Sequence, residues 1–214
     1  MTTVPATPTG GWTTESQAAW YVDRISGDHP RDPGEAVLVE VLPTAPERML
    51  DLGAGDGRLT ALVLAHRASV AQAVLVDRSA PMLRRAAERF AGDARVRVQE
   101  WDLGDPIDAM GDFDLIVSGF AIHHLEDDRK RGLFAEVARQ LRPGGLFANL
   151  EVVSSRSPRR HAEFLTAIGR TADDPEDRLA SVEEQLHWME DAGLSNVDCL
   201  WRWRGFALMV GERG

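Results

Sequence analysis

Three glycines alternate in the segment DLGAGDG, which spans residues 51–57 and directly precedes a predicted helix. Because glycine has no side chain, such a turn lets the backbone pass close to a ligand at the start of a helix. A dinucleotide-binding turn has the spacing G-x-G-x-x-G, whereas here Gly53, Gly55 and Gly57 alternate and Arg58 takes the sixth position. The spacing therefore predicts a ligand site and disfavours NAD.

Two histidines and a glutamate could move a proton in the same region. His123 and His124 follow the apolar segment 113–119, and Glu151 lies near the end of the segment 145–153. Imidazole titrates near neutral pH, and α/β sheets bind ligands at the carboxyl ends of their strands. We therefore predict these three residues as catalytic candidates, with His123 preferred as a general base. The alternatives are that the histidines pack the loop beside the ligand and that Glu151 caps the next loop.

Short apolar segments alternate with helical ones from Arg48 onward, which predicts a parallel sheet covered by helices on both faces. The last two segments are separated only by Arg204 and Gly205, too few residues for a crossover helix, so they should pair antiparallel. The predicted strands are 48–52, 73–77, 96–100, 113–119, 145–153, 197–203 and 206–212. The predicted helices among them are 58–67, 80–90, 127–141 and 182–192.

This order of motifs resembles the class I S-adenosylmethionine-dependent methyltransferases. In that family an acidic residue and G-x-G-x-G follow the first strand, as they do from Asp51 here. The segments 74–86, 99–103, 113–125 and 141–145 resemble the next four family motifs, in order. The resemblance implies an α/β fold: a seven-stranded, mostly parallel doubly wound sheet with the last strand antiparallel, helices on both faces and an N-terminal helical cap. It also implies S-adenosyl-L-methionine as the cofactor.

The resemblance further implies roles for the matching residues. Asp51 would orient the glycine turn or bind the cofactor's amino group, Asp77 would accept both ribose hydroxyls, and Met82 would lie against the adenine. Asp102 would bind the adenine amino group. Taken singly, each has a structural alternative as an ordinary turn, helix cap or core residue. The expected cofactor-binding set is Asp51, Gly53, Ala54, Gly55, Asp77, Arg78, Met82, Asp102, Leu103, Ser118, Gly119 and Phe120.

The remaining segments should complete one domain over residues 12–214, after a flexible tail at 1–11. We expect a cap at 12–46, a cofactor-binding core at 47–152, a substrate lid at 153–180 and a C-terminal helix with a strand pair at 181–214. The acidic run Asp173 to Asp177 should be a solvated loop. The expected substrate contacts come from the cap and the lid, with core packing as their alternative, and are Trp12, Trp20, Tyr21, His161 and Phe164.

Composition narrows the function. The formal charge of −10 disfavours nucleic acid as a partner, and a single cysteine excludes a disulfide or a multi-cysteine zinc site, so we assign no metal ligand. Without a signal or membrane-spanning pattern we expect a cytoplasmic protein. We predict methyl transfer to an O or N atom of a small metabolite. The alternatives are a methyltransferase acting on RNA or protein, a Rossmann oxidoreductase and a non-catalytic cofactor-binding protein, and a homodimer stays open.

Overall fold

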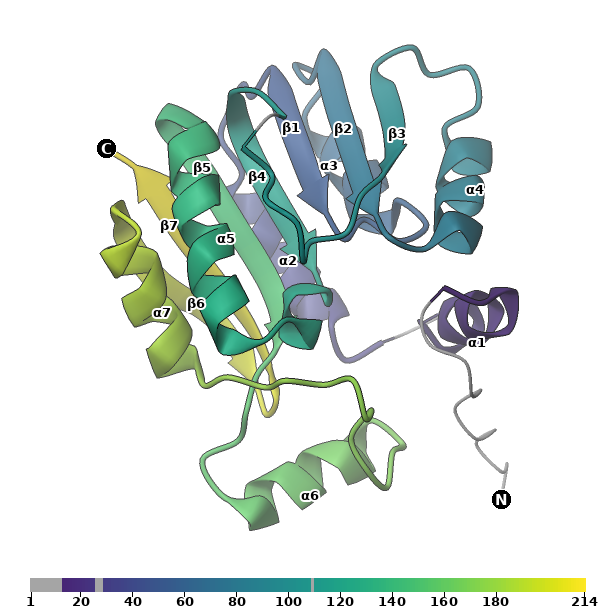
Figure 1. The fold of residues 1–214 in the computed structure, drawn as a ribbon, viewed down its shortest axis with the longest axis vertical. Helices are drawn as coiled ribbons and strands as arrows, with labels where there is room; N and C mark the ends of the chain where they lie inside the picture. Colours follow the sequence, from purple (N-terminus) through teal and green to yellow (C-terminus); the bar gives the residue numbers. More distant parts are fainter. Residues whose placement is uncertain (1–12, 26–28, 109) are drawn as a thin grey trace.

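A single mixed sheet organises residues 13–25, 29–108 and 110–214, which are the residues described by the computed structural model (Figure 1). Its seven strands lie in the order β3-β2-β1-β4-β5-β7-β6, and β7 runs antiparallel to the other six. The predicted fold class is confirmed. The strands are β1 (Arg48–Leu52), β2 (Gln72–Asp77), β3 (Val96–Glu100), β4 (Phe113–Gly119), β5 (Leu141–Val152), β6 (Leu194–Trp203) and β7 (Phe206–Arg213).

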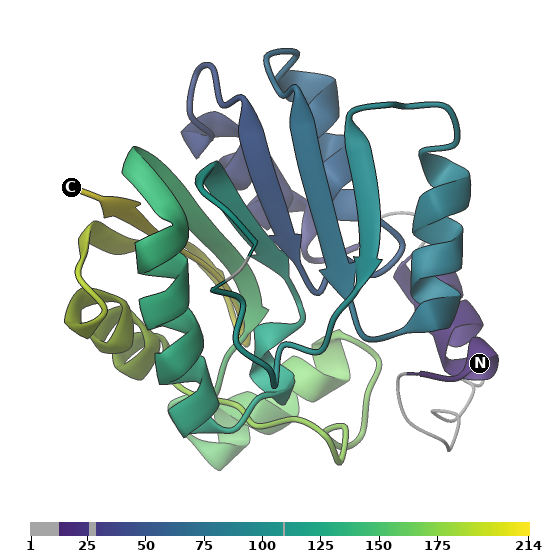
Figure 2. The same ribbon diagram turned by 45° about the horizontal axis from the view of Figure 1, so that its top comes forward.

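Helices cover both faces of the sheet, as Figures 1 and 2 show. On one face α2 (Asp32–Val41), α3 (Arg58–His66) and α4 (Ala80–Arg89) pack over the strands. On the other, α5 (Asp127–Gln140) and α7 (Val182–Asp191) do so, beside the loop that joins β3 to β4. The four helices predicted for the core begin where expected and end one residue earlier.

Two helices and one short turn lie near the carboxyl ends of the strands. Figure 1 places α6 (Pro158–Ala167) beyond the strand tips and α1 (Glu15–Ile25) to one side, where Glu15 pairs with Arg84 of α4 at 2.8 Å. The turn η1 (Ile122–His124) follows β4 directly. These segments surround the edge at which a ligand is expected. Among the described residues, no helix is long and apolar enough to cross a membrane.

The segment 141–145, which precedes the predicted strand 145–153, is itself part of that strand. β5 begins at Leu141, immediately after α5, and its pairing with β4 shifts register between Phe113 and Leu115. Gly144, with φ +77°, supplies the left-handed backbone in this irregular stretch. The Pro-Gly-Gly sequence therefore makes an irregularity inside the strand and does not separate it from the helix.

Candidate active site

The first pocket lies at the carboxyl ends of β1, β2 and β4 and is lined by every predicted cofactor-binding residue except Ser118. Ser118 is buried in β4, where its hydroxyl donates a hydrogen bond to the Leu52 carbonyl at 2.8 Å. The hydroxyl therefore joins two strands and does not line the pocket. The neighbouring Gly119 and Phe120 do line it.

The turn requires glycine at two positions, because the backbone there is left-handed and a Cβ would lie close to a neighbouring atom. Gly53 has φ +67°, and a Cβ there would lie 2.2 Å from the Ala121 Cβ, so no side chain fits. Gly55 has φ +56°, and its Cβ would lie 3.1 Å from the Met82 Cε. These close approaches bring the β1–α3 turn, the segment after β4 and α4 together around one ligand space.

Asp77 is held by the backbone on both of its oxygens. Its Oδ2 accepts a hydrogen bond from the Gly55 N–H at 2.9 Å, and its Oδ1 accepts one from the Ser79 N–H at 2.7 Å. Burial raises the pKa of Asp77 against the lowering effect of these donors. An ionised carboxylate accepts about four hydrogen bonds, so each oxygen keeps capacity for one more, and Asp77 lines the first pocket. The arrangement can receive two adjacent hydroxyls.

Asp51 is fully buried at the end of the central strand β1. Its Oδ2 accepts a hydrogen bond from the Thr60 hydroxyl at 2.7 Å, whereas its Oδ1 has no hydrogen-bond partner among the described residues. Burial raises the pKa of Asp51 to about 7, against the Thr60 hydrogen bonds. Because Asp51 also lines the first pocket, a cationic group there would satisfy the bare oxygen and favour the ionised carboxyl.

The rim of the first pocket carries the remaining predicted residues. Met82 is almost fully buried, and Asp102 is exposed with its Oδ1 accepting the Gly104 N–H at 2.8 Å. Arg78 reaches across to Glu176, 2.7 Å away in the segment that follows α6. This ion pair ties the cofactor-side rim to the predicted lid.

A second pocket adjoins the first and shares three lining residues with it: Arg31, Phe120 and His124. We call it the acceptor pocket. Phe120 and Phe164 each contact Phe206 edge to face, with ring centroids 5.0 and 5.1 Å apart, and the three rings form an aromatic wall. The guanidinium of Arg31 lies 5.6 Å from the centroid of Phe120, which places a cation at the junction.

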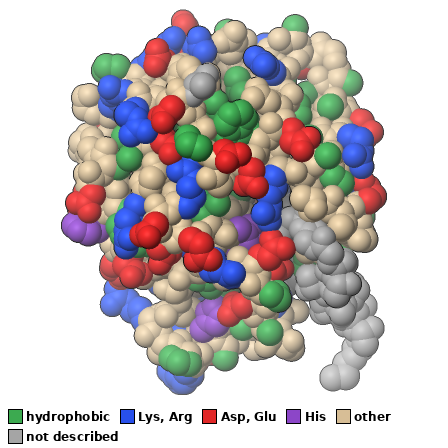
Figure 3. All heavy atoms as spheres, in the orientation of Figure 1, with side chains coloured by type: hydrophobic (Ala, Val, Ile, Leu, Met, Phe, Trp, Pro, Cys, Tyr) green, Lys and Arg blue, Asp and Glu red, His purple; other side chains and the backbone are tan. Residues whose placement is uncertain are grey.

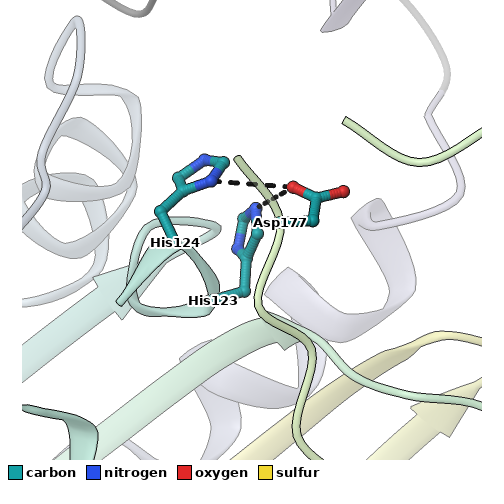
Figure 4. Close-up of side chains that lie close together, drawn as sticks. All are labelled: His123, His124 and Asp177. Atoms are coloured by element: carbon teal, nitrogen blue, oxygen red, sulfur yellow. Dashed lines mark ion pairs between the residues drawn. The ribbon is translucent and has the colours of Figure 1, made fainter. Parts of the chain in front are cut away.

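The predicted catalytic residues have different surroundings. Glu151 is fully buried and lines neither pocket; it accepts the His123 backbone N–H at 3.0 Å and contacts the His123 Nδ1 at 2.5 Å. His123 lines the acceptor pocket only, and His124 lines both pockets. Figure 4 shows both rings beside the Asp177 carboxylate, with His123 Nε2 and His124 Nδ1 at 3.4 and 3.6 Å from its Oδ1.

These surroundings separate the two histidines electrostatically. Burial lowers the pKa of His123, but the charges of Glu151 and Asp177 outweigh it and raise that pKa above its usual value. Burial, and then the charge on His123, lower the pKa of His124. At neutral pH the apo site therefore favours a protonated His123 and a neutral His124. This disfavours the expected preference for His123 as the base, because a general base must be free to accept a proton.

Only some of the predicted substrate residues line the acceptor pocket. Trp20 and Phe164 line the acceptor pocket, whereas His161 lies outside its lining and contacts Asp173 through Nε2 at 2.8 Å. Trp12 lies outside the described residues, and so does the side chain of Tyr21.

The prediction of a solvated acidic loop holds for Asp173 but is wrong for Asp174 and Asp177. Asp174 is 8% exposed, and the Asp177 side chain is 5% exposed. Both line the acceptor pocket, because the segment after α6 folds back over η1. Sequence reasoning also missed Arg31, which lines both pockets. A run of acids gives no sign of burial, whereas the position of Arg31 just before the Asp-Pro start of α2 could have suggested a residue fixed at a helix end.

Known proteins similar to this chain agree with the fold. A family model described as "Methyltransferase domain" matches residues 49–145. A demethylmenaquinone methyltransferase of Clavibacter sepedonicus is 42% identical over 176 residues, which are 74% of this chain and 69% of that protein. An uncharacterized methyltransferase of Mycobacterium tuberculosis is 37% identical over 120 residues, 56% of this chain and 58% of that protein. The chain thus spans less than two thirds of the second relative.

A solved structure extends the likeness to nearly the whole chain. Human N-acetylserotonin methyltransferase, solved in complex with SAM, superposes with a TM-score of 0.70 at 14% identity, over 95% of this chain and 57% of that one. At this identity the likeness concerns the fold. Together with the sequence relatives, it shows that the chain belongs to the class I S-adenosylmethionine-dependent methyltransferase family.

Proposed function

We propose that this protein binds S-adenosylmethionine in the first pocket and transfers its methyl group to an O or N atom of a small metabolite in the acceptor pocket. The observation that carries the proposal is the junction of the two pockets, where Phe120 and His124 line both. Methyl transfer needs the acceptor atom, the methyl carbon and the sulfur in line, and adjoining pockets allow this. The names of two relatives support a small-molecule acceptor, one being a methyltransferase for demethylmenaquinone and one for N-acetylserotonin.

The cofactor would be held by groups at the rim and floor of the first pocket. The two ligand-facing sites of Asp77 suit the ribose hydroxyls, and the bare Oδ1 of Asp51 suits the cofactor's ammonium group. Met82 would pack on the adenine, with Asp102 beside its amino group. The glycine turn would let the methionine part pass between these contacts.

The acceptor would be flat and largely apolar, without several negative charges. Its wall is aromatic, and its charged lining consists of three aspartates (Asp173, Asp174 and Asp177) and two arginines (Arg31 and Arg170). This small excess of acidic groups disfavours a polycarboxylate. On the face in Figure 3, acidic and basic side chains are interspersed and no continuous basic surface appears. A basic surface is what RNA would require. These features favour a phenol, enol or aromatic amine.

The test pairs Asp77→Ala with Glu100→Ala. Glu100 is the register partner of Asp77 on β3, but it is exposed and outside the pocket lining. Calorimetry with S-adenosylhomocysteine should show binding to the wild type and the Glu100 variant. Loss of charge-assisted hydrogen bonds should weaken binding to Asp77→Ala by about 1–3 kcal/mol, and Asp77→Asn should be milder.

Methyl transfer should then be screened by mass spectrometry over phenols, enols, aromatic amines and polycarboxylates. Product from the first three classes supports the proposal. NAD binding without S-adenosylhomocysteine binding would overturn the cofactor assignment, and cofactor binding with no methylated product across the screen would favour a non-catalytic protein. An unchanged dissociation constant in Asp77→Ala would mean that another group holds the ribose.

A further inference from the structure

Three ligand-type atoms converge between the two pockets: His123 Nε2, His124 Nδ1 and Asp177 Oδ1 (Figure 4). All three lie within 4.8 Å of one another. The two nitrogen–oxygen distances, 3.4 and 3.6 Å, exceed the usual range of an N–H···O hydrogen bond. Ligands about 2.1 Å from a zinc ion and at the tetrahedral angle are about 3.4 Å from one another, so these distances match the edges of a metal site.

Asp177 is oriented as a ligand by its own neighbours. Its Oδ2 accepts the Asp174 N–H at 3.1 Å, which fixes the carboxylate and directs its Oδ1 toward the two rings. That Oδ1 is buried and accepts no hydrogen bond from any residue that the structure describes. A buried carboxylate oxygen is costly unless a cation satisfies it, and a metal ion here would take the place of the proton on the His123 ring beside it.

His123 has the outer contact that metal-bound histidines usually have. Its Nδ1 lies 2.5 Å from the Glu151 Oε1, and its own backbone N–H donates to the Glu151 Oε2 at 3.0 Å. Glu151 thereby keeps a proton on Nδ1, so Nε2, which faces Asp177, is the nitrogen that can give up its proton to a metal ion. A carboxylate–histidine contact of this kind orients the ring and strengthens it as a ligand.

We propose that His123, His124 and Asp177 bind one divalent transition-metal ion, with zinc as the ion that best suits two imidazoles and a carboxylate. Three protein ligands leave a coordination position for water or an acceptor oxygen, as in catalytic zinc sites. Because His123 and Asp177 line the acceptor pocket and His124 lines both pockets, that position lies near the methyl-transfer junction. The ion takes the place of the Nε2 proton, which passes to solvent. Metal binding itself does not depend on the proposed methyl transfer.

The test measures zinc binding to chelator-treated protein without any cofactor. Equilibrium dialysis with elemental analysis should give one zinc per chain. The Asp177→Asn variant should lose affinity by more than about a hundredfold, and Glu151→Gln, which keeps the ring's partner but not its charge, by about 10- to 100-fold. Asp173→Asn is the matched control, because Asp173 lies in the same pocket but contacts His161. It should bind zinc like the wild type.

Two further measurements keep the proposal open to refutation. The His187→Ala variant removes an exposed histidine beside Glu190 and Asp191, and zinc lost there and not in Asp177→Asn would mean adventitious surface binding. If Asp177→Asn fails to fold, as judged by circular dichroism, His124→Ala provides the same test. Cobalt should give the absorption of a four-coordinate ion in the wild type. No stoichiometric zinc, or equal zinc in all variants, would overturn the site, while retained S-adenosylhomocysteine binding would leave the proposed function intact.

Discussion

The buried Asp51 predicts an unusual dependence of stability on pH. Its pKa is about 7 in the folded protein against an ordinary value of 3.8, because the central strand removes it from water. Below pH 3.8 both states hold the proton, and as pH rises toward 7 only the folded state keeps it. The folded state therefore loses stability over that window. With about 1.4 kcal/mol for each tenfold difference in proton affinity, the full loss is about 4 kcal/mol by pH 8.

The Asp51→Asn variant isolates this effect, since an amide of the same shape carries no charge. Urea unfolding at pH 5, 6, 7 and 8 should show the free energy of unfolding of the wild type falling relative to the variant, and the difference should level off above pH 7. Asp93→Asn is the control: Arg95 lowers the pKa of Asp93 to about 2, so that difference should stay flat over the same range. Parallel curves for the wild type and Asp51→Asn would refute the reasoning.

Three further results should follow from the site. Affinity for S-adenosylhomocysteine should rise about tenfold from pH 6 to 8 as Asp51 ionises, and calorimetry should find no such rise in Asp51→Asn. Gly53→Ala should lower the melting temperature and abolish cofactor binding, because its Cβ would meet Ala121 at 2.2 Å; Gly92→Ala, equally left-handed but with nothing within 4 Å, should suffer only the backbone strain. His124→Ala should reduce kcat by more than it weakens cofactor binding, and the reverse order would remove His124 from the junction.

Much of the fold could be predicted because local patterns and tertiary packing agree. The helix predicted at 182–192 begins with a capping box. The Ser181 side chain accepts the Glu184 backbone N–H, and the Glu184 side chain accepts the Ser181 backbone N–H. The glycine turn fixed the position of the first pocket, because its alternating spacing allows few other backbone paths. The lining of the first pocket could therefore be predicted from one short segment and the strands that pair beside it.

The acceptor pocket could not be predicted from the sequence, because it depends on contacts between residues that lie far apart along the chain. Among the expected cofactor-binding residues too, Ser118 showed no sign that its hydroxyl would donate to Leu52 on the neighbouring strand. The burial of Asp177 arises from a segment that returns to η1 after α6, more than fifty residues after His123. Neither periodicity nor charge encodes such a return. A run of aspartates has the same sequence pattern whether it faces solvent or a pair of imidazoles.

The segment that folds back to η1 after α6 is held in place by backbone hydrogen bonds and ion pairs around Arg178. Its N–H donates to the His123 carbonyl at 2.8 Å, and its side chain pairs with Glu126 at 2.7 Å. Lys130, the chain's one lysine, is buried and donates to the Arg178 carbonyl. These contacts place Asp177, the preceding residue, against both histidines. A pocket anchored in this way should need little rearrangement to bind, so we expect substrate choice to depend on the side chains of the predicted lid more than on any motion of it.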